Sequence, residues 1–196
     1  MDKIKPIPKT AIFIDYSNVF IPGRNLFGIN IDPPKMINFL SKGKNIVHTY
    51  LFSSENPKNK GEMNFYRVMR TKGIIVETER LVERPVKIYC PNCKELLMPL
   101  NCPNCGEEYN LPPHKSKRID VRMAAQLLDK CHTFDEIIIV GGDQDFIPVI
   151  RILRKDKGKK VYIASFQEPL SSELITEVDG ITILDTHVDK IKYVKK

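Results

Sequence analysis

Four aspartates stand where the ends of strands or the start of a helix would present acidic side chains. Asp15 directly follows the apolar run 11–14, and Asp143 follows a second apolar run, with Asp145 two residues later. Asp120 stands at the start of a helical pattern. Taken singly, an aspartate at such a place is often a helix cap or a turn residue. Because ligands of an open α/β sheet bind at the carboxyl ends of its strands, we expect the four side chains to gather there.

Clustered carboxylates predict a site for a divalent cation. Acids that share one place are costly to keep ionised unless a cation neutralises them, and oxygen ligands in this number suit Mg²⁺ or Mn²⁺. Such an ion can bind a phosphodiester oxygen, lower the pKa of a bound water and stabilise the leaving oxygen, so we expect phosphodiester hydrolysis. Asn18 is expected to orient the scissile phosphate or a metal-bound water, and Ser17 is a weaker candidate beside it.

Two Cys-Pro-Asn-Cys segments, eight residues apart, predict a structural zinc site formed by Cys90, Cys93, Cys102 and Cys105. Two residues between cysteines let both thiolates reach one metal, and two such pairs complete a tetrahedral four-cysteine site. Disulfides or free thiols are the alternatives, but paired disulfides are rare in cytosolic proteins. Four protein ligands leave no open position for catalysis, so zinc is expected to fold its segment. Cys131 lies on an apolar helical face and is expected to be a buried thiol.

The elements that must position these residues alternate between strands and helices. Apolar runs predict strands at 11–14, 45–52, 74–78, 136–140, 160–164 and 181–184. Helical spacing predicts helices at 35–41, 59–71, 119–131, 146–155 and 169–177. Pro22, Gly23 and Gly28 predict a loop after the first strand. This alternation is typical of an α/β fold with a mostly parallel sheet covered by helices on both faces.

The composition changes between residues 85 and 113, where four cysteines and six prolines interrupt the periodic pattern. We therefore predict that residues 1–84 and 114–190 form one domain, that residues 85–113 are a zinc-binding insert, and that residues 191–196 are a basic tail. The length of 196 residues suits one domain with an insertion.

The charge balance favours a polyanionic partner weakly. Lys and Arg number 31 against 24 Asp and Glu, which gives a net charge of +7. A basic stretch leads into the helix of Asp120, and its expected phosphate-binding residues are Lys115, Lys117, Arg118 and Arg122. No apolar run approaches the ~20 residues that a membrane span needs. The first residues lack the apolar stretch of a secretion signal, so a cytoplasmic location and no membrane partner are expected.

Three segments resemble, in order, the motifs of the NYN domain, a branch of the PIN-like nucleases: residues 13–18, 117–121 and 140–146. The resemblance spans Ala11 to Leu184 apart from the insert. It implies a Rossmann-like sheet and a Mg²⁺- or Mn²⁺-dependent ribonuclease, with cleavage within a strand expected rather than from its end.

The resemblance also assigns roles to residues. It implies metal ligands at Asp15, Asp120, Asp143 and Asp145. Asn18 matches the polar residue of the family's first motif, and Lys117 matches its basic residue before the second aspartate. One position departs from the family, which often has Ser or Thr where this chain has Gly141, so one hydroxyl near the metal is absent.

Other functions stay open. A noncatalytic RNA-binding or adaptor protein is the main alternative, because zinc knuckles bind single strands and PIN-like folds can lose activity. DNA is not excluded as the substrate, since nothing in these residues reads a 2′-hydroxyl. A dinucleotide-dependent enzyme is disfavoured because no GxGxxG follows the first strand. The sequence leaves the oligomeric state open, a homodimer included.

Overall fold

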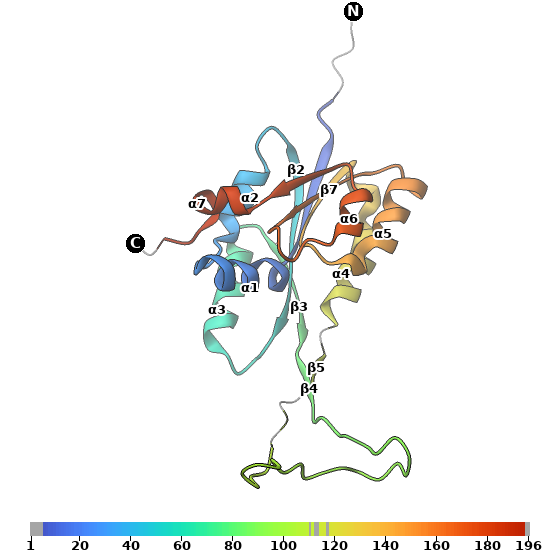
Figure 1. The fold of residues 1–196 in the computed structure, drawn as a ribbon. Coiled ribbons are helices and arrows are strands. Elements are labelled where there is room, and N and C mark those ends of the chain that lie inside the picture. The colour runs from blue at the N-terminus through green and yellow to red at the C-terminus, as the bar shows by residue number, and fades with distance from the viewer. Residues whose placement is uncertain (1–5, 110, 112–113, 117, 195–196) are drawn as a thin grey trace, which may run out of the picture.

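One parallel sheet organises the chain (Figure 1). The structure is a computed structural model and describes residues 6–109, 111, 114–116 and 118–194. Six strands form the sheet in the order β3-β2-β1-β6-β7-β8. Their bounds are β1 Lys9–Asp15, β2 Asn45–Glu55, β3 Ile75–Arg80, β6 Glu136–Val140, β7 Lys160–Ser165 and β8 Gly180–Ile183. Every neighbouring pair in this sheet is parallel, which confirms the predicted fold class.

Helices cover both faces of the sheet, as Figure 1 shows. One face carries α1 (Tyr16–Phe27), α2 (Pro33–Leu40), α3 (Lys60–Thr71) and the short α7 (Val188–Ile191). The other face carries α4 (Ile119–Lys130), α5 (Ile147–Arg151) and α6 (Ser172–Thr176). Side chains alternate between the faces along each strand. Phe13 and Ile139 therefore pack in the core beneath α4 and α5, whereas Ile14 and Val140 pack beneath α1 and α2.

The prediction of a loop after β1 is wrong, because Tyr16–Phe27 form helix α1. Asp15 caps its first turn by accepting a hydrogen bond from the backbone N–H of Asn18. Pro22 stands inside the helix, and Gly23 is buried where a Cβ would lie 3.0 Å from the side chain of Ile31. Burial against the chain that follows therefore outweighs the weak helix propensity of these two residues.

Several helices differ from their predicted bounds. The helix expected at 146–155 consists of a 3₁₀ turn η2 (Gln144–Phe146), α5 and a π turn η3 (Ile152–Asp156). The helix expected at 169–177 is confined to α6. Two further 3₁₀ turns are η1 (Cys131–Thr133), which holds the buried thiol of Cys131 as predicted, and η4 (Asp185–His187).

A two-stranded antiparallel ribbon, β4 (Val82–Arg84) and β5 (His114–Ser116), flanks the cysteine-rich segment. Figure 1 shows this segment extending away from the sheet at the end of the ribbon. The last described residues pack back against the domain. Tyr193 N–H donates to the carbonyl of Asn30 at 2.7 Å, and Lys192 forms an isolated antiparallel β-bridge with Ile31.

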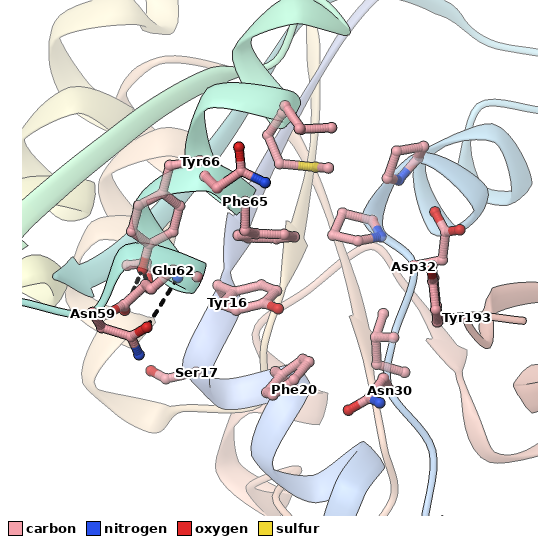
Figure 2. Close-up of a pocket in the computed structure, with 18 of the residues that line it drawn as sticks. Tyr16, Ser17, Phe20, Asn30, Asp32, Asn59, Glu62, Phe65, Tyr66 and Tyr193 are labelled. Atoms are coloured by element: carbon pink, nitrogen blue, oxygen red, sulfur yellow. Dashed lines mark hydrogen bonds between the residues drawn. The ribbon is translucent and has the colours of Figure 1, made fainter. Parts of the chain in front are cut away.

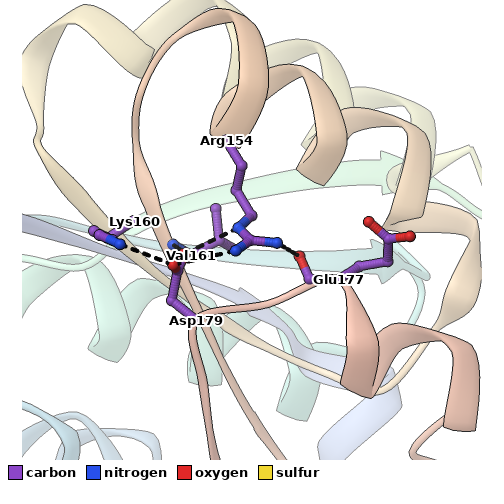
Figure 3. A network of polar contacts seen from close by, with 5 residues as sticks. All are labelled: Arg154, Lys160, Val161, Glu177 and Asp179. Carbon is purple, nitrogen blue, oxygen red and sulfur yellow. Dashed lines mark hydrogen bonds and ion pairs between the residues drawn. The ribbon is translucent and has the colours of Figure 1, made fainter.

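A polar network fastens the start of β8 to β7 and to the helix that precedes β7 (Figure 3). The carboxylate of Asp179 accepts from Val161 N–H at 2.9 Å and is paired with Arg154 and Lys160, each at 3.0 Å. Arg154 also donates to the carbonyl of Glu177 at 2.7 Å. Burial alone would raise the pKa of Asp179, but these donors outweigh it and lower that pKa.

We expect Asp179→Asn to lower the free energy of unfolding by about 2 kcal/mol at neutral pH, because it leaves Arg154 without a charged acceptor. A lowered pKa in the folded state stabilises the fold above the unfolded pKa, and this contribution is lost as the pH falls through the folded pKa. In urea titrations, the difference between wild type and variant should be full at pH 7 and shrink below pH ~4. Asp189→Asn is the control, since that side chain is 88% exposed; an equal loss there would contradict the prediction.

Candidate active site

The order of the strands reverses between β1 and β6, which makes their carboxyl ends the topological switch point of the sheet. Ile14 of β1 is in register with Val140 of β6. Past this pair, the chain leaves β1 through Asp15 into α1 and leaves β6 through the turn 141–143. In open α/β sheets the crevice at this point is the usual place for a ligand. The fold thus brings Asp15 and the turn that leads to Asp143 to the same edge of the sheet.

Asp15 is buried at this point, with 2% of its surface exposed. Its Oδ1 accepts hydrogen bonds from the hydroxyl of Ser17 at 2.9 Å and from the backbone N–H of Asn18 at 3.1 Å. Its Oδ2 accepts one from the side-chain amide of Asn18 at 3.3 Å. The carboxylate therefore serves as the N-cap of α1 and also fixes both polar residues that the sequence placed beside it.

Two glycines let the turn after β6 pass close to Asp15. A Cβ on Gly141 would lie 3.5 Å from Cβ of Asp15 and 3.6 Å from Cβ of Asn18, and its φ of +153° is one that side-chain-bearing residues rarely adopt. A Cβ on Gly142 would lie only 2.5 Å from the carbonyl oxygen of Pro169. The backbone conformation at Gly141 accounts for a residue without a hydroxyl at this position.

Asp143 and Asp145 belong to a tight turn beyond the glycines. The Oδ1 of Asp143 accepts from the backbone N–H of Asp145 at 2.9 Å, so Asp143 caps η2. Asp145 is exposed, and the buried ring of Phe146 anchors the turn in the core. The turn is also tied to the segment before α6, because Ser171 N–H donates to the carbonyl of Gly142 at 3.2 Å.

The helix of Asp120 reaches the same edge of the sheet. Arg122 in its first turn is paired with Glu77 at 2.7 Å and with Glu79 at 2.6 Å, both on β3. Glu77 is in register with Phe52 of β2, and Phe52 is in register with Asp15. The first turn of α4 therefore lies at the level of the sheet where β1 ends, and Asp120 is half-buried in that turn.

The predicted phosphate-binding residues fall into different situations. Arg122 directs its guanidinium to the two glutamates, and the hydrogen bond that it donates to Glu79 raises its pKa. Arg118 is exposed immediately before α4, and Lys115 lies in β5. Lys117 lies outside the described residues. A role of these four residues in binding nucleic acid stays a prediction.

The aspartates lie at one edge of the sheet but do not form a complete metal site. Within the part of the chain that the structure describes, no three side chains of Asp, Glu, His or Cys come close enough to hold one metal ion. The available donors are carboxylate oxygens from three separate segments, which is the ligand chemistry that Mg²⁺ and Mn²⁺ prefer. The chemistry of these donors thus suits such an ion.

The two Cys-Pro-Asn-Cys segments fold in the same way. The N–H of Cys90 donates to the carbonyl of Glu95, and the N–H of Cys102 donates to the carbonyl of Glu107, both at 2.8 Å. Each segment closes in a residue with a left-handed backbone, Lys94 in the first and Gly106 in the second. The same turn therefore occurs twice, and the second copy begins twelve positions after the first.

Backbone amides point at the first sulfur of each turn. The N–H groups of Cys93 and Asn92 lower the pKa of the Cys90 thiol, and those of Cys105 and Asn104 do the same for Cys102. This favours the thiolate, which is the form that binds zinc. Among the described residues, however, the two pairs are not drawn together into one four-cysteine group.

A cavity that the sequence did not predict opens beside the acidic edge, between α1 and α3 (Figure 2). Its volume is about 850 Å³, and one wall is a column of three rings. Tyr16 stacks on Phe20 with ring centroids 4.8 Å apart, and it contacts Phe65 at 5.1 Å. We call this hollow, defined by Tyr16, Phe20 and Phe65, the aromatic cavity. Burial raises the pKa of Tyr16 above its ordinary value.

Sequence reasoning missed the aromatic cavity because it assigned a loop to residues that form α1. Tyr16 and Phe20 are four residues apart, which brings them onto one side of a helix but has no such meaning in a loop. A helix assignment for residues 16–27 would have exposed this signal.

None of the described helices is long and apolar enough to cross a membrane.

Comparison with solved structures supports the fold. The chain is similar to a protein of unknown function from Vibrio parahaemolyticus RIMD 2210633, with 19% sequence identity, a TM-score of 0.69, and coverage of 97% of this chain and 99% of that chain. At this identity the likeness concerns the fold alone.

Two Sir2 structures match more loosely. Sir2Af2 bound to a myristoylated histone peptide has 14% identity and a TM-score of 0.39, covering 93% of this chain and 90% of that chain. A structure concerned with the mechanism and regulation of Sir2 enzymes has 12% identity and a TM-score of 0.40, covering 94% and 92%. TM-scores this low carry no argument about this chain.

Sequence comparison identifies the family. No curated protein matches the chain. The model of the NYN domain matches residues 9–185. This range includes Asp15, the helix of Asp120, the turn with Asp143 and Asp145, and the cysteine-rich segment. With its parallel sheet and its acids at the switch point, this chain belongs to the NYN domain family.

Proposed function

We propose that the chain is a ribonuclease that hydrolyses RNA phosphodiester bonds with Mg²⁺ or Mn²⁺. The observation that best supports this proposal is the contact between Asp15 and the turn 141–143. The contact lies at the switch point of a NYN-domain sheet. Asp120 reaches the same edge on the first turn of α4. Asp15, Asp120, Asp143 and Asp145 are the proposed metal ligands, and cleavage within a strand is proposed over cleavage from an end.

The residues of the proposed site have different roles. The carboxylates would hold the ion, which when bound lowers the pKa of a water and neutralises charge on the phosphate. Asn18 is held against Asp15 by its side-chain amide, so it is placed to orient the scissile phosphate. Ser17 donates to Oδ1 of Asp15 and so holds this proposed ligand in position. Gly141 lets the turn after β6 lie against Asp15 and Asn18.

A noncatalytic RNA-binding or adaptor role is the second candidate, and one observation favours it. No three acids among the described residues stand close enough for one ion, and Asp15 and Asp143 both cap helical turns. In that case the acids would be structural, and the protein would bind RNA without cutting it. Metal-dependent cleavage separates the two candidates.

Zinc and the cellular setting complete the proposal. We assign a structural Zn²⁺ to Cys90, Cys93, Cys102 and Cys105, supported by the repeated turn and by the lowered thiol pKa of Cys90 and Cys102. Closing the site would require the two turns to approach each other, which zinc binding commonly drives. A cytoplasmic location fits reduced thiols but stays a prediction.

We expect Asp143→Asn to reduce RNA cleavage by roughly a hundredfold or more, because a neutral amide cannot replace an anionic ligand. The assay is single-turnover cleavage of a labelled single-stranded RNA with Mg²⁺ or Mn²⁺, with thermal denaturation to show that folding persists. Asp189→Asn, an exposed carboxylate far along the chain, is the matched control and should cleave like wild type. Cleavage that survives both Asp143→Asn and chelation would point to a contaminant and refute the assignment.

We expect the double change Cys90→Ser and Cys93→Ser to release zinc and loosen residues 85–113 while the six-stranded sheet stays folded, because the insert extends from the sheet on the ribbon β4–β5. Metal content by mass spectrometry and amide hydrogen exchange measure the two effects. Cys131→Ser should keep the zinc, since that thiol is buried in the main core. Loss of protection throughout the sheet would show that the insert is not a separate unit.

A further inference from the structure

Helix α4, which carries Asp120, is attached to the edge strand β3 by an ionic contact. The guanidinium of Arg122 lies 2.7 Å from a carboxylate oxygen of Glu77 and 2.6 Å from one of Glu79. Because side chains alternate along a strand, these two glutamates stand on the same face of β3. One turn later on α4, the amide of Gln126 donates to the other oxygen of Glu77 at 3.1 Å. We call the contact of Arg122 with Glu77 and Glu79 the arginine clamp.

The arginine clamp holds a helix end that has no side-chain cap. Helices α1, α2 and α3 each follow a residue whose side chain accepts a backbone N–H of the first turn, namely Asp15, Asp32 and Asn59. Arg118 precedes α4 and makes no such bond within the described part of the chain. The ends of helices open more easily than their middles, and a cap opposes this opening. The clamp therefore gives the first turn of α4 an attachment that a cap supplies elsewhere.

The place of the clamp on α4 determines which way Asp120 lies. The buried face of the helix consists of Ile119, Met123 and Leu127. Successive residues turn by ~100° around a helix, so positions 120 and 122 lie on opposite flanks of this buried face. The flank of Arg122 meets β3, while α4 also contacts β2 and β1. Position 120 is therefore on the flank toward β1, the strand that ends in Asp15.

The charges of the arginine clamp disfavour a direct contact between Arg122 and a nucleic acid. Two carboxylates face one guanidinium, so the clamp as a whole is negative and repels a phosphate. The side chain of Arg122 is 41% exposed, so burial does not keep a phosphate away. The two glutamates do, because a phosphate could pair with the guanidinium only by displacing one of them.

We propose that Arg122 is a positioning residue for the reaction. Through Glu77 and Glu79 it holds the first turn of α4, and with it Asp120, beside the end of β1. The inference rests on the proposed function, because it takes Asp120 to be a metal ligand. Arg122 itself contacts neither the metal nor RNA. Removing a partner that orients a metal ligand commonly lowers metal affinity or activity by roughly 10- to 100-fold.

The first test removes the acceptors and leaves the arginine in place. The double change Glu77→Gln and Glu79→Gln releases the guanidinium of Arg122, which could then pair with a phosphate. If Arg122 acts by positioning, single-turnover cleavage of a labelled RNA with Mn²⁺ should slow roughly tenfold. If Arg122 instead binds phosphate, cleavage should stay the same or become faster, and that result would overturn the proposal.

The second test measures Mn²⁺ binding to Arg122→Ala by electron paramagnetic resonance, without RNA. Loss of a positive charge would by itself strengthen the binding of a cation, whereas we expect binding to weaken roughly tenfold because Asp120 is no longer held. Added to the two glutamate changes, Arg122→Ala should cause no further loss of Mn²⁺ binding or cleavage, because all three changes break one contact. A further loss of cleavage in the triple variant would show that Arg122 contacts RNA.

A matched control and a local measurement accompany both tests. Arg151→Ala breaks an arginine–glutamate pair of the same length, 2.6 Å, next to β8 at the opposite edge of the sheet, and should behave like wild type. In Arg122→Ala the amides of residues 122–126 should exchange hydrogen faster, while those of 127–130 keep their protection. Unchanged exchange would contradict the positioning role. Should the double glutamate variant not fold, Glu79→Gln alone gives the same comparison at a side chain that is 33% exposed.

Failure of this inference can be told apart from failure of the ribonuclease assignment. Wild-type protein that neither binds Mn²⁺ nor cleaves RNA would refute the hydrolase. Metal-dependent cleavage by wild type, together with unaltered Mn²⁺ binding by Arg122→Ala, would refute the positioning role alone.

Discussion

The close approach of the turn after β6 to the end of β1 is the constraint on which the acidic edge depends. The two strands are paired as far as Ile14 and Val140, and the chain then departs to opposite faces of the sheet. Gly142 is wedged against the carbonyl of Pro169, where a Cβ would be 2.5 Å away, while Gly141 lies against Asp15. A side chain at Gly142 would push the turn after β6 away from the loop that contains Pro169. Asp15 and Asp143 would then move apart.

The capping roles of the acids do not compete with a metal. A carboxylate offers about four acceptor positions. Asp15 accepts three hydrogen bonds, two of them on Oδ1, so Oδ2 keeps capacity for a cation. Those same bonds hold the side chain in one orientation, which is what a metal ligand requires from its surroundings. An aspartate after a strand can therefore cap a helix and still serve as the ligand that we propose.

The sheet could be predicted from the sequence, whereas α1 could not. Strands such as Glu136–Val140 are buried on both faces, so they stand out as continuous apolar runs. The segment after β1 contains Pro22 and Gly23, and local preference argues against a helix there. The decisive contact is with Ile31, whose side chain packs so closely on Gly23 that any Cβ would be crowded. Local periodicity does not show a contact between elements. For this reason the aromatic cavity, which depends on α1, could not be predicted either.

Charge was harder to predict than burial, because ion pairs form between segments that are distant in the chain. Arg122 belongs to the stretch expected to bind phosphate, yet the fold brings it to Glu77 and Glu79. Arg151 and Arg154 are likewise paired with Glu177 and Asp179, next to β8 at the opposite edge of the sheet. A guanidinium already paired with a carboxylate contributes little net charge toward a polyanion. The proposed binding of RNA must therefore depend on cations outside these pairs.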